Sequence, residues 1–152
     1  MLLENKRTED HEKIITLLDK ACEIGHTSSC TTLANIYASP RIAEENFTLA
    51  AEHYEQACNQ GEQEACSSLA NLYYVGQGVE EDHKKSAVIS EQSCSKNNAP
   101  ACIMAGTQYM NGDGVQQNND KALGLLKKAC ALKSDSGCQS LSKFQTTLHK
   151  YD

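Results

Sequence analysis

The chain has 152 residues, of which 39% are hydrophobic and 22% charged, so a folded domain or a short repeat array is expected rather than a disordered segment. A net charge of −6 and the lack of any Lys/Arg cluster argue against a protein that binds nucleic-acid phosphates. No apolar run is long enough to span a bilayer, and the opening MLLENKRTED does not resemble a signal peptide. With no Trp and 2 Phe, the core must come from Ala, Leu and other small residues, which favours closely packed helices.

Eight cysteines divide the chain into four units of equal length. The first cysteine of each pair recurs every 36 residues, the second keeps the same step, and no insertion interrupts the period. The pairs are Cys22 and Cys30, Cys58 and Cys66, Cys94 and Cys102, and Cys130 and Cys138. The sequence therefore predicts a single domain, 1–152, built from four repeats at about 10–45, 46–81, 82–117 and 118–152.

The first helix of each unit is expected to run from a polar cap to the first cysteine. Twelve residues before that cysteine stand residues whose short side-chain oxygens favour the N-cap: Asp10, Asn46, Asp82 and Asn118. The positions eight, four and one before the cysteine follow the helical period and are expected to face the core. They are Ile14, Leu18 and Ala21 in the first unit, but Ser86, Ser90 and Ser93 in the third.

A turn is expected three residues after the first cysteine, at Gly25, Gly61 and Asn97, because Gly and Asn tolerate a left-handed backbone. Lys133 stands at the fourth such position and does not fit, so a different turn is expected there. The second cysteine then opens a second helix, at roughly 29–39, 65–75, 101–111 and 137–147. The strings GQGV and GDGV predict the loops that end two of these helices.

The short turn places the two cysteines of each unit beside one another, because it joins the end of one helix to the start of the next. The repeat therefore favours four local disulfides, Cys22–Cys30, Cys58–Cys66, Cys94–Cys102 and Cys130–Cys138. The alternative is that the thiols are free and pack as small apolar groups. Disulfides imply an oxidising compartment, so we expect a periplasmic or secreted protein whose leader was removed; a cytoplasmic protein with reduced thiols is the alternative.

Two stretches, ACSSLANLYYVGQGVEEDHKKS (65–86) and ACIMAGTQYMNGDGVQQNNDKA (101–122), resemble the Sel-one-like repeat. The resemblance runs from residue 10 to about residue 145, and the cysteine pairs resemble those of the cysteine-rich branch, as in the Helicobacter cysteine-rich proteins. It implies an all-α fold, an α/α superhelix of helix-turn-helix units related to tetratricopeptide arrays. It also implies a protein that binds proteins or peptides, as an adaptor or a secreted interaction protein. Other members are immunity proteins against bacterial toxins, and some cysteine-rich members bind penicillins or weakly hydrolyse β-lactams.

No constellation of residues indicates an active site. Two Ser-x-x-Lys strings, SCSK (93–96) and SLSK (140–143), lack the Lys-Thr-Gly of serine β-lactamases, and about one such string is expected by chance. The five histidines have no metal spacing, and two cysteines per unit are too few ligands for zinc. We therefore expect a monomeric, non-enzymatic protein with no cofactor or metal. An immunity protein and a weak penicillin-binding protein or β-lactamase are the alternatives.

A partner is expected on the concave inner face that stacked repeats create. By analogy with tetratricopeptide arrays the second helices line this face, with three inward positions in each. They are Thr31, Asn35 and Ala38; Ser67, Asn71 and Tyr74; Ile103, Thr107 and Met110; and Gln139, Lys143 and Thr146. Asn35 and Asn71 suit a peptide backbone because an amide both donates and accepts; the alternative is a bond to the next helix or to water. Tyr74, Ile103 and Met110 are expected to add an apolar anchor.

Overall fold

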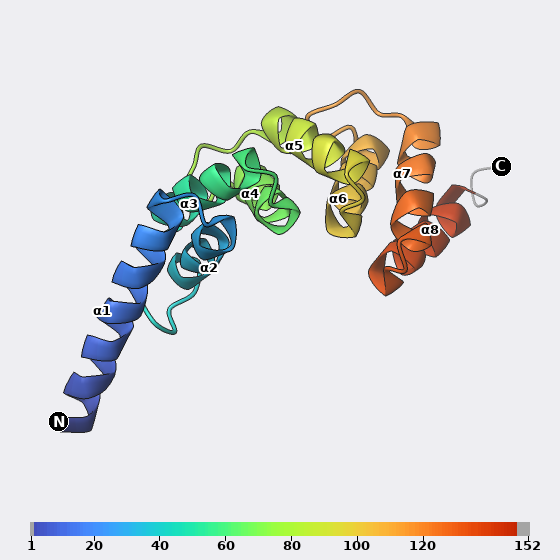
Figure 1. Ribbon diagram of the computed structural model, residues 1–152. Coiled ribbons are helices and arrows are strands. Elements are labelled where there is room, and N and C mark those ends of the chain that lie inside the picture. Colours follow the sequence, from blue (N-terminus) through green and yellow to red (C-terminus); the bar gives the residue numbers. More distant parts are fainter. Residues whose placement is uncertain (1, 149–152) are drawn as a thin grey trace.

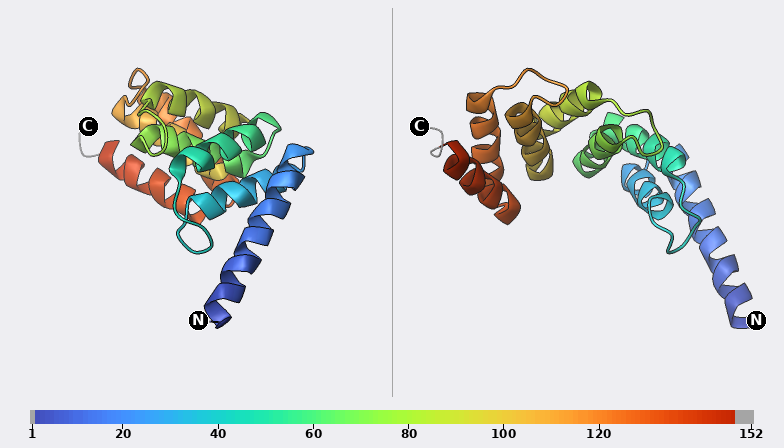
Figure 2. Two further views of the ribbon diagram at one scale, coloured as in Figure 1. Left: turned by 90° about the vertical axis from the view of Figure 1, so that its left-hand side faces the viewer. Right: turned by 180° about the vertical axis from the view of Figure 1, so that it is seen from behind.

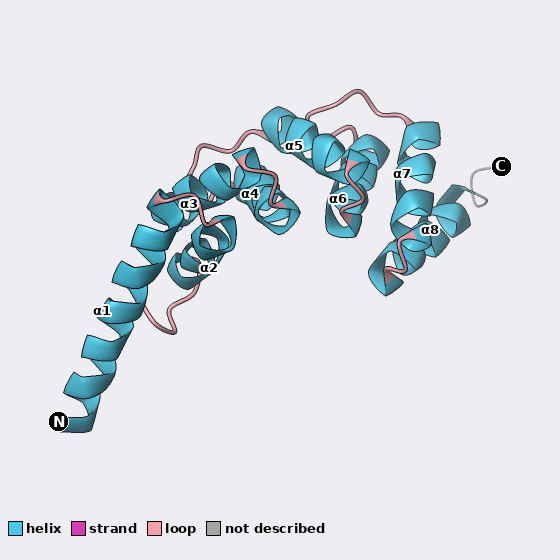
Figure 3. Ribbon diagram, in the orientation of Figure 1, coloured by secondary structure: helices cyan, strands magenta, loops and turns pink. Residues whose placement is uncertain are grey.

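A computed structural model describes residues 2–148, which form eight α-helices and no strand. The helices are α1 (Leu2–Glu23), α2 (Thr27–Tyr37), α3 (Phe47–Asn59), α4 (Gln63–Val75), α5 (His83–Ser95), α6 (Ala99–Asn111), α7 (Asn119–Ala131) and α8 (Asp135–Leu148). Each consecutive pair forms a hairpin, and the four hairpins, here units 1 to 4, stack in chain order (Figures 1 and 3). The predicted all-α superhelix of four helix-turn-helix units is confirmed.

The array is an arch whose inner side is lined by the second helix of each unit. Figure 1 shows α2, α4, α6 and α8 toward the inside of the arch, and the view from behind in Figure 2 shows the same arrangement. Helix α6 packs against both α4 and α8, so α4, α6 and α8 form a continuous surface. This is the concave face expected of stacked repeats.

Side-chain caps begin three of the outer helices. The side chains of Asn46, Asp82 and Asn118 each accept a bond from the backbone N–H three residues later, at 2.8–3.1 Å. The prediction that Asp10 is a cap is wrong, because α1 spans Leu2–Glu23 and Asp10 lies inside it. The residues from Leu2 to Asp10 include neither Gly nor Pro, so the helix continues through this segment.

All four hairpin turns adopt the left-handed backbone conformation. The φ angles are 90° at Gly25, 96° at Gly61, 67° at Asn97 and 61° at Lys133. The prediction of a different turn at Lys133 is therefore wrong. A left-handed conformation costs an ordinary residue roughly 1–2 kcal/mol, and the disulfide that closes the same short turn in every unit holds Lys133 there.

The four predicted disulfides are present, and no described cysteine is free. Each joins the last turn of an outer helix to the first turn of the inner helix of the same unit, with Cα atoms 4.4–4.7 Å apart. The rings are equal in size. By lowering the entropy of the unfolded chain, each disulfide stabilises the folded state by about 2.5 kcal/mol in the chain-entropy model. Such bonds persist in oxidising surroundings, which indicates an extracytoplasmic environment. Over residues 2–148, no helix combines the length and the apolar character that crossing a bilayer requires.

The core differs from unit to unit. Around α3 it contains Ala50, Tyr54 and Ala57, whereas the matched positions of α5 hold Ser86, Ser90 and Ser93, each at most 2% exposed. Gln108 of α6 is also buried, at a position that carries Ile36, Leu72 and Phe144 in the other units. Ile14, predicted to be in the core, is 41% exposed, so the described helices leave part of this side of α1 uncovered.

The GQGV and GDGV loops fold back onto the start of the outer helix of their own unit. A Cβ atom on Gly78 would overlap the backbone of Phe47, and one on Gly114 would overlap that of His83. Only glycine permits so close an approach, and both residues also have a positive φ. The loops therefore fix the end of α4 and α6, the helices that carry the candidate site.

Candidate functional site

Two adjoining hollows indent the arch where α4 lies beside α6. The first has a volume of about 390 Å³, and its wall includes Tyr54, Ser67, Ser68, Asn71, Gln77, Pro100 and Met104. The second has a volume of about 290 Å³ and is lined by Asn71, Tyr74, Pro100, Ile103, Met104, Thr107 and Gln108. Because Asn71, Pro100 and Met104 belong to both walls, the two hollows form one groove. Among the residues that the structure describes, no charged side chain lines either hollow.

The structure brings half of the ten proposed partner-binding residues to this groove: Ser67, Asn71, Tyr74, Ile103 and Thr107. Ala38, at the same kind of inward position, lines the first hollow. Met110 is half-buried against the cluster of Leu126 and Phe144, beyond the groove. Gln139 and Lys143 lie exposed on α8, which contributes no residue to either hollow.

Thr31 and Thr146 use their hydroxyl groups within their own helices. Thr31 is buried, and its Oγ1 donates to the Thr27 carbonyl at 3.4 Å. Thr146 Oγ1 donates to the Ser142 carbonyl at 2.9 Å. Neither hydroxyl has its proton free for a partner, and neither residue lines the groove.

The matched asparagines Asn35 and Asn71 have different surroundings. The Oη of Tyr54 on α3 donates a hydrogen bond to Asn35 Oδ1, so Asn35 is held by the outer helix of the next unit. The residue that stands in the same relation to Asn71, 19 positions later, is Ser90. Asn71 is exposed, and its side-chain amide has no hydrogen-bond partner in the described part of the chain. Asn71 therefore presents a free donor and acceptor to the groove, and Asn35 does not.

A second pair of matched positions, Ser68 and Met104, also differs between units 2 and 3. In unit 2 the large Tyr54 lies beside the small Ser68, and in unit 3 the matched residues are the small Ser90 and the large Met104. Burial raises the pKa of Tyr54 above its ordinary value of 10.0. Met104 is half-buried and accepts a bond from Ser86 Oγ at 3.7 Å, and it contributes to the walls of both hollows.

Tyr74 lines the second hollow and also ties unit 2 to unit 3. Its Oη donates to Asp113 Oδ2 at 3.0 Å, and its ring stacks on His83 with the centroids 4.6 Å apart. The hydrogen bond to the Asp113 carboxylate raises the pKa of Tyr74 above 10.0, with burial as a smaller cause. The sequence pattern placed Tyr74 outside the packing positions, whereas the structure shows that it stabilises the junction as well.

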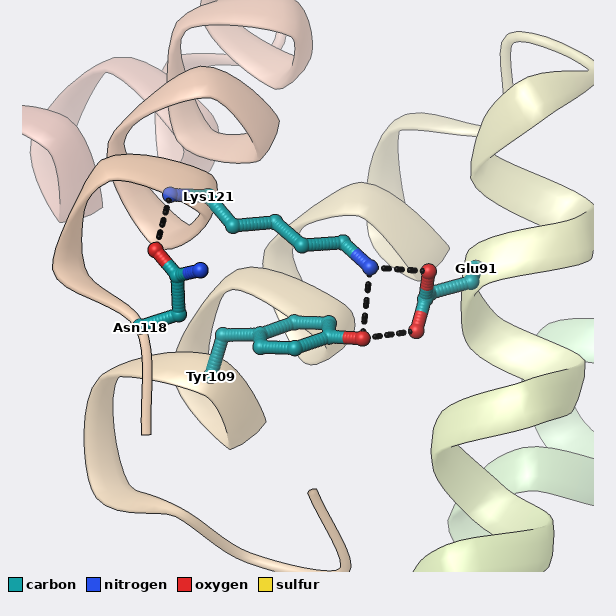
Figure 4. A network of polar contacts seen from close by, with 4 residues as sticks. All are labelled: Glu91, Tyr109, Asn118 and Lys121. Carbon is teal, nitrogen blue, oxygen red and sulfur yellow. Dashed lines mark hydrogen bonds and ion pairs between the residues drawn. The ribbon is translucent and has the colours of Figure 1, made fainter. Parts of the chain in front are cut away.

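Sequence reasoning missed a polar clamp that recurs between units. Figure 4 shows Lys121 on α7, whose Nζ lies 2.7 Å from Glu91 Oε2 and 2.6 Å from Tyr109 Oη, while Tyr109 Oη donates to Glu91 and Asn118 caps the helix. The matched trio Glu55, Tyr73 and Lys85 joins units 2 and 3 more loosely: Lys85 Nζ lies 2.6 Å from Tyr73 Oη and 3.7 Å from Glu55 Oε1. Each lysine also lies about 4 Å above the tyrosine ring, at 4.0 and 4.1 Å from its centre. The signal in the sequence was the 36-residue spacing of Glu, Tyr and Lys.

In the Ser-x-x-Lys string SCSK (93–96), the serine hydroxyl bonds within the core and the lysine lies on the surface. Ser93 is buried, and its Oγ donates to Gln63 Oε1 at 2.9 Å. Lys96, at the end of α5, is exposed. Among the residues that the structure describes, no group of three or more His, Cys, Asp or Glu side chains could hold a metal ion.

The stacked helical hairpins, with a groove between α4 and α6, define a repeat solenoid. The Sel1 repeat profile matches three stretches of the chain, residues 33–62, 63–98 and 99–134, and the chain belongs to the Sel1 repeat family. Each stretch comprises an inner helix together with the outer helix that follows it, apart from their ends. Sel1 repeats commonly mediate protein interactions.

Three solved structures are similar to the chain. A protective antigen of uropathogenic Escherichia coli with an SLR fold has a TM-score of 0.79 and 22% identity, over 84% of this chain and 27% of that protein. A Sel1 repeat protein from Oxalobacter formigenes has a TM-score of 0.75 and 24% identity, over 84% and 96% of the two chains. Helicobacter pylori cysteine rich protein B has a TM-score of 0.69 and 26% identity, over 87% and 95%. No curated protein matches the chain significantly in sequence.

Proposed function

We propose that this protein is a non-enzymatic module that binds a protein or peptide segment in the groove between α4 and α6. The observation that carries this proposal is the free side-chain amide of Asn71, which lies in the wall shared by both hollows. A side-chain amide can accept from the N–H and donate to the C=O of a peptide. The apolar parts of Tyr74, Ile103 and Met104 lie beside it and suit the side chains of such a segment.

The compartment and the oligomeric state belong to the same proposal. A module with four disulfides meets its partner where disulfides persist, so we place it in the periplasm or outside the cell. A single chain already contains the complete groove, so we expect it to act as a monomer.

Site-specific photo-crosslinking tests the location of the partner. A photoreactive amino acid replaces Gln77, an exposed residue in the wall of the first hollow, in the full oxidised chain. The matched control places it at Lys84, an exposed residue of the outer helix α5. We expect a crosslinked partner from the source cells with Gln77 alone. Crosslinking from Lys84 that exceeds crosslinking from Gln77 would place the partner on the outside of the arch.

Paired asparagine substitutions test the role of the free amide. Asn71→Ala should weaken binding of the crosslinked partner by about 5- to 150-fold, because a lost bond that leaves a buried group unpaired costs about 1–3 kcal/mol. Asn35→Ala is the matched control: its Oδ1 is already bound by Tyr54, so its loss should lower stability and leave binding within about twofold. Calorimetric titration measures the affinity and a thermal melt the stability. Equal effects of the two changes on affinity would contradict the assignment of Asn71.

A further inference from the structure

We propose that one edge of α1 is a docking surface for the end of another disulfide-closed repeat chain, whose last hairpin carries a carboxylate on its outer helix and a tyrosine on its inner helix. This α1 edge consists of Lys13, Leu17 and Lys20, together with Ile24 just after the helix. The inference goes beyond the groove between α4 and α6 and does not depend on it, because none of the four residues lines that groove.

Helix α1 repeats the residues with which α7 meets unit 3. Residues 13–24 read KIITLLDKACEI, and residues 121–132, exactly three periods later, read KALGLLKKACAL. The four residues of the α1 edge correspond in order to Lys121, Leu125, Lys128 and Leu132.

In unit 4 these matched residues lie at the junction with unit 3. Leu125 and Leu132 pack against the cluster that includes the buried disulfide of unit 3. Lys128 Nζ donates to the carbonyl of Ser95, at the end of α5, at 3.4 Å. Lys121 forms the polar clamp with unit 3 that Figure 4 shows.

The same edge of α3 and of α5 adjoins the disulfide of the preceding unit. His53, at the position of Leu17, has its Nδ1 3.9 Å from Cys22 Sγ. Ile89, at the same position of α5, lines a hollow together with both cysteines of unit 2. The position of Leu17 therefore adjoins a neighbouring disulfide at all three junctions within the chain.

On α1 the described part of the chain leaves this edge uncovered. Leu17 is 67% exposed and Ile24 86%, whereas the matched Leu125 and Leu132 are half-buried. Lys13 and Leu17 also border a hollow of about 470 Å³ whose lining residues all belong to α1. Exposed apolar residues that are gathered along one edge, at positions used elsewhere for packing between units, indicate a contact surface for protein.

The clamp position determines which hairpin fits this edge. Lys13 stands where Lys85 and Lys121 stand, and each of these pairs with a glutamate and bonds to a tyrosine of the preceding unit. The last unit of this chain carries Lys127 and Gln145 at the glutamate and tyrosine positions. A second copy would thus bring a lysine against Lys13, which is unfavourable. The occupant is therefore a different chain with an acid and a tyrosine at these positions.

A modified copy of the full, oxidised chain serves as the probe. Lys127→Glu with Gln145→Tyr gives its last unit the acid and the tyrosine of unit 3. Leu17→Glu with Ile24→Glu prevents the probe from stacking on itself. The control probe carries only these last two changes, and the unmodified chain supplies the α1 edge. Circular dichroism and a thiol assay establish that both probes are folded and oxidised.

Calorimetric titration measures the affinity of the unmodified chain for each probe. We expect 1:1 binding to the probe that is about fivefold or more tighter than binding to the control probe. In the binding chain, Leu17→Glu and Ile24→Glu should each weaken it by about tenfold or more. Val88→Glu, at an exposed apolar position of α5, is the matched control and should leave it unchanged. Lys13→Glu should weaken binding to the probe and strengthen binding to the control probe, because the charge opposite it is reversed.

Three results would contradict the inference. A folded probe that does not bind the chain would show that the α1 edge is not a docking surface. Binding that survives both Leu17→Glu and Ile24→Glu would place the contact elsewhere. A control probe that binds as tightly as the probe would make a second copy the occupant, in place of a different chain. The proposed function is unaffected by any of these results, because Asn71→Ala tests the groove separately.

Discussion

Units 2 and 3 share the same disulfide ring, the same left-handed turn and the same glycine loop, but they pack differently. Helix α3 buries Ala50, Tyr54 and Ala57, whereas α5 buries three serines at the matched positions. The covalent frame and the backbone turns therefore do not require a fully apolar core in every unit. A unit that is held by its disulfide and its caps can therefore hold polar residues at core positions, as unit 3 does.

The polar core of unit 3 is only partly satisfied. Ser93 Oγ bonds to Gln63, and Ser86 Oγ reaches Met104 Sδ. Gln108 Nε2 donates to the His83 carbonyl at 3.1 Å, but Gln108 Oε1 and Ser90 Oγ have no partner in the described part of the chain. Each buried polar atom left unpaired costs about 1–3 kcal/mol. The disulfide, which is worth about 2.5 kcal/mol in the chain-entropy model, offsets a cost of this size.

The largest expected effect comes from the matched positions Tyr54 and Ser90. Tyr54→Ala should lower the free energy of unfolding by about 3–5 kcal/mol, because it leaves a cavity and an unpaired Asn35. Ser90→Ala should leave it unchanged or raise it by up to about 1 kcal/mol, because it removes an unpaired hydroxyl. Urea denaturation of the oxidised chains measures both values. Destabilisation by Ser90→Ala similar to that of Tyr54→Ala would show that the two junctions are packed alike.

The repeat itself made most of the fold predictable. A strict 36-residue period means that matched positions have matched structural roles in every unit. The helix pairs, three caps and four disulfides could therefore all be derived from it. Predictions from the preference of a single residue were wrong at two positions, where the surrounding structure determines the backbone conformation. Lys133 follows the backbone of its glycine counterparts, and Asp10 lies inside a helix because no turn precedes it.

The candidate site was less accessible to sequence reasoning. The inward positions could be assigned from the period and the analogy with tetratricopeptide arrays, and six of the twelve line the groove. What distinguishes Asn71 from Asn35 is a contact with the following unit, and such a contact depends on how the hairpins stack. A signal was nevertheless present, because Tyr54 and Ser90 each stand 19 residues after an asparagine of the inner helix.

Amide hydrogen exchange should show the same contrast without mutation. The amides of residues 82–94, in α5, should exchange about tenfold faster than those of residues 46–58, in α3. The physical reason is that α5 buries less apolar surface and two partnerless polar atoms lie in its unit. Mass spectrometry of peptic fragments, after reduction in the quench, measures both segments in one sample. Equal protection would mean that the clamps and disulfides alone determine local opening.

The smallest expected effect concerns the polar clamps on either side of unit 3. The Lys121 ammonium lies 2.7 Å from Glu91, whereas that of Lys85 lies 3.7 Å from Glu55, and all four side chains are between 33% and 49% exposed. Exposed pairs contribute about 0.2–1 kcal/mol. Lys121→Gln should therefore destabilise the chain by less than about 1 kcal/mol, and Lys85→Gln by less again.

The dependence on pH distinguishes this electrostatic contribution from packing. The bond to Glu91, followed by that to Tyr109, raises the pKa of Lys121 above 10.5 in the folded chain, and the bond to Tyr73 is the first cause for Lys85. A raised lysine pKa means that the folded state holds its proton more tightly, so the stabilisation is complete below pH 10.5 and is lost as the pH rises through the folded value. Denaturation curves from pH 8 to 11.5 should thus decline less steeply for Lys121→Gln than for the unmodified chain. Parallel declines would show that the lysine acts through its methylene stem on the Tyr109 ring and not through its charge.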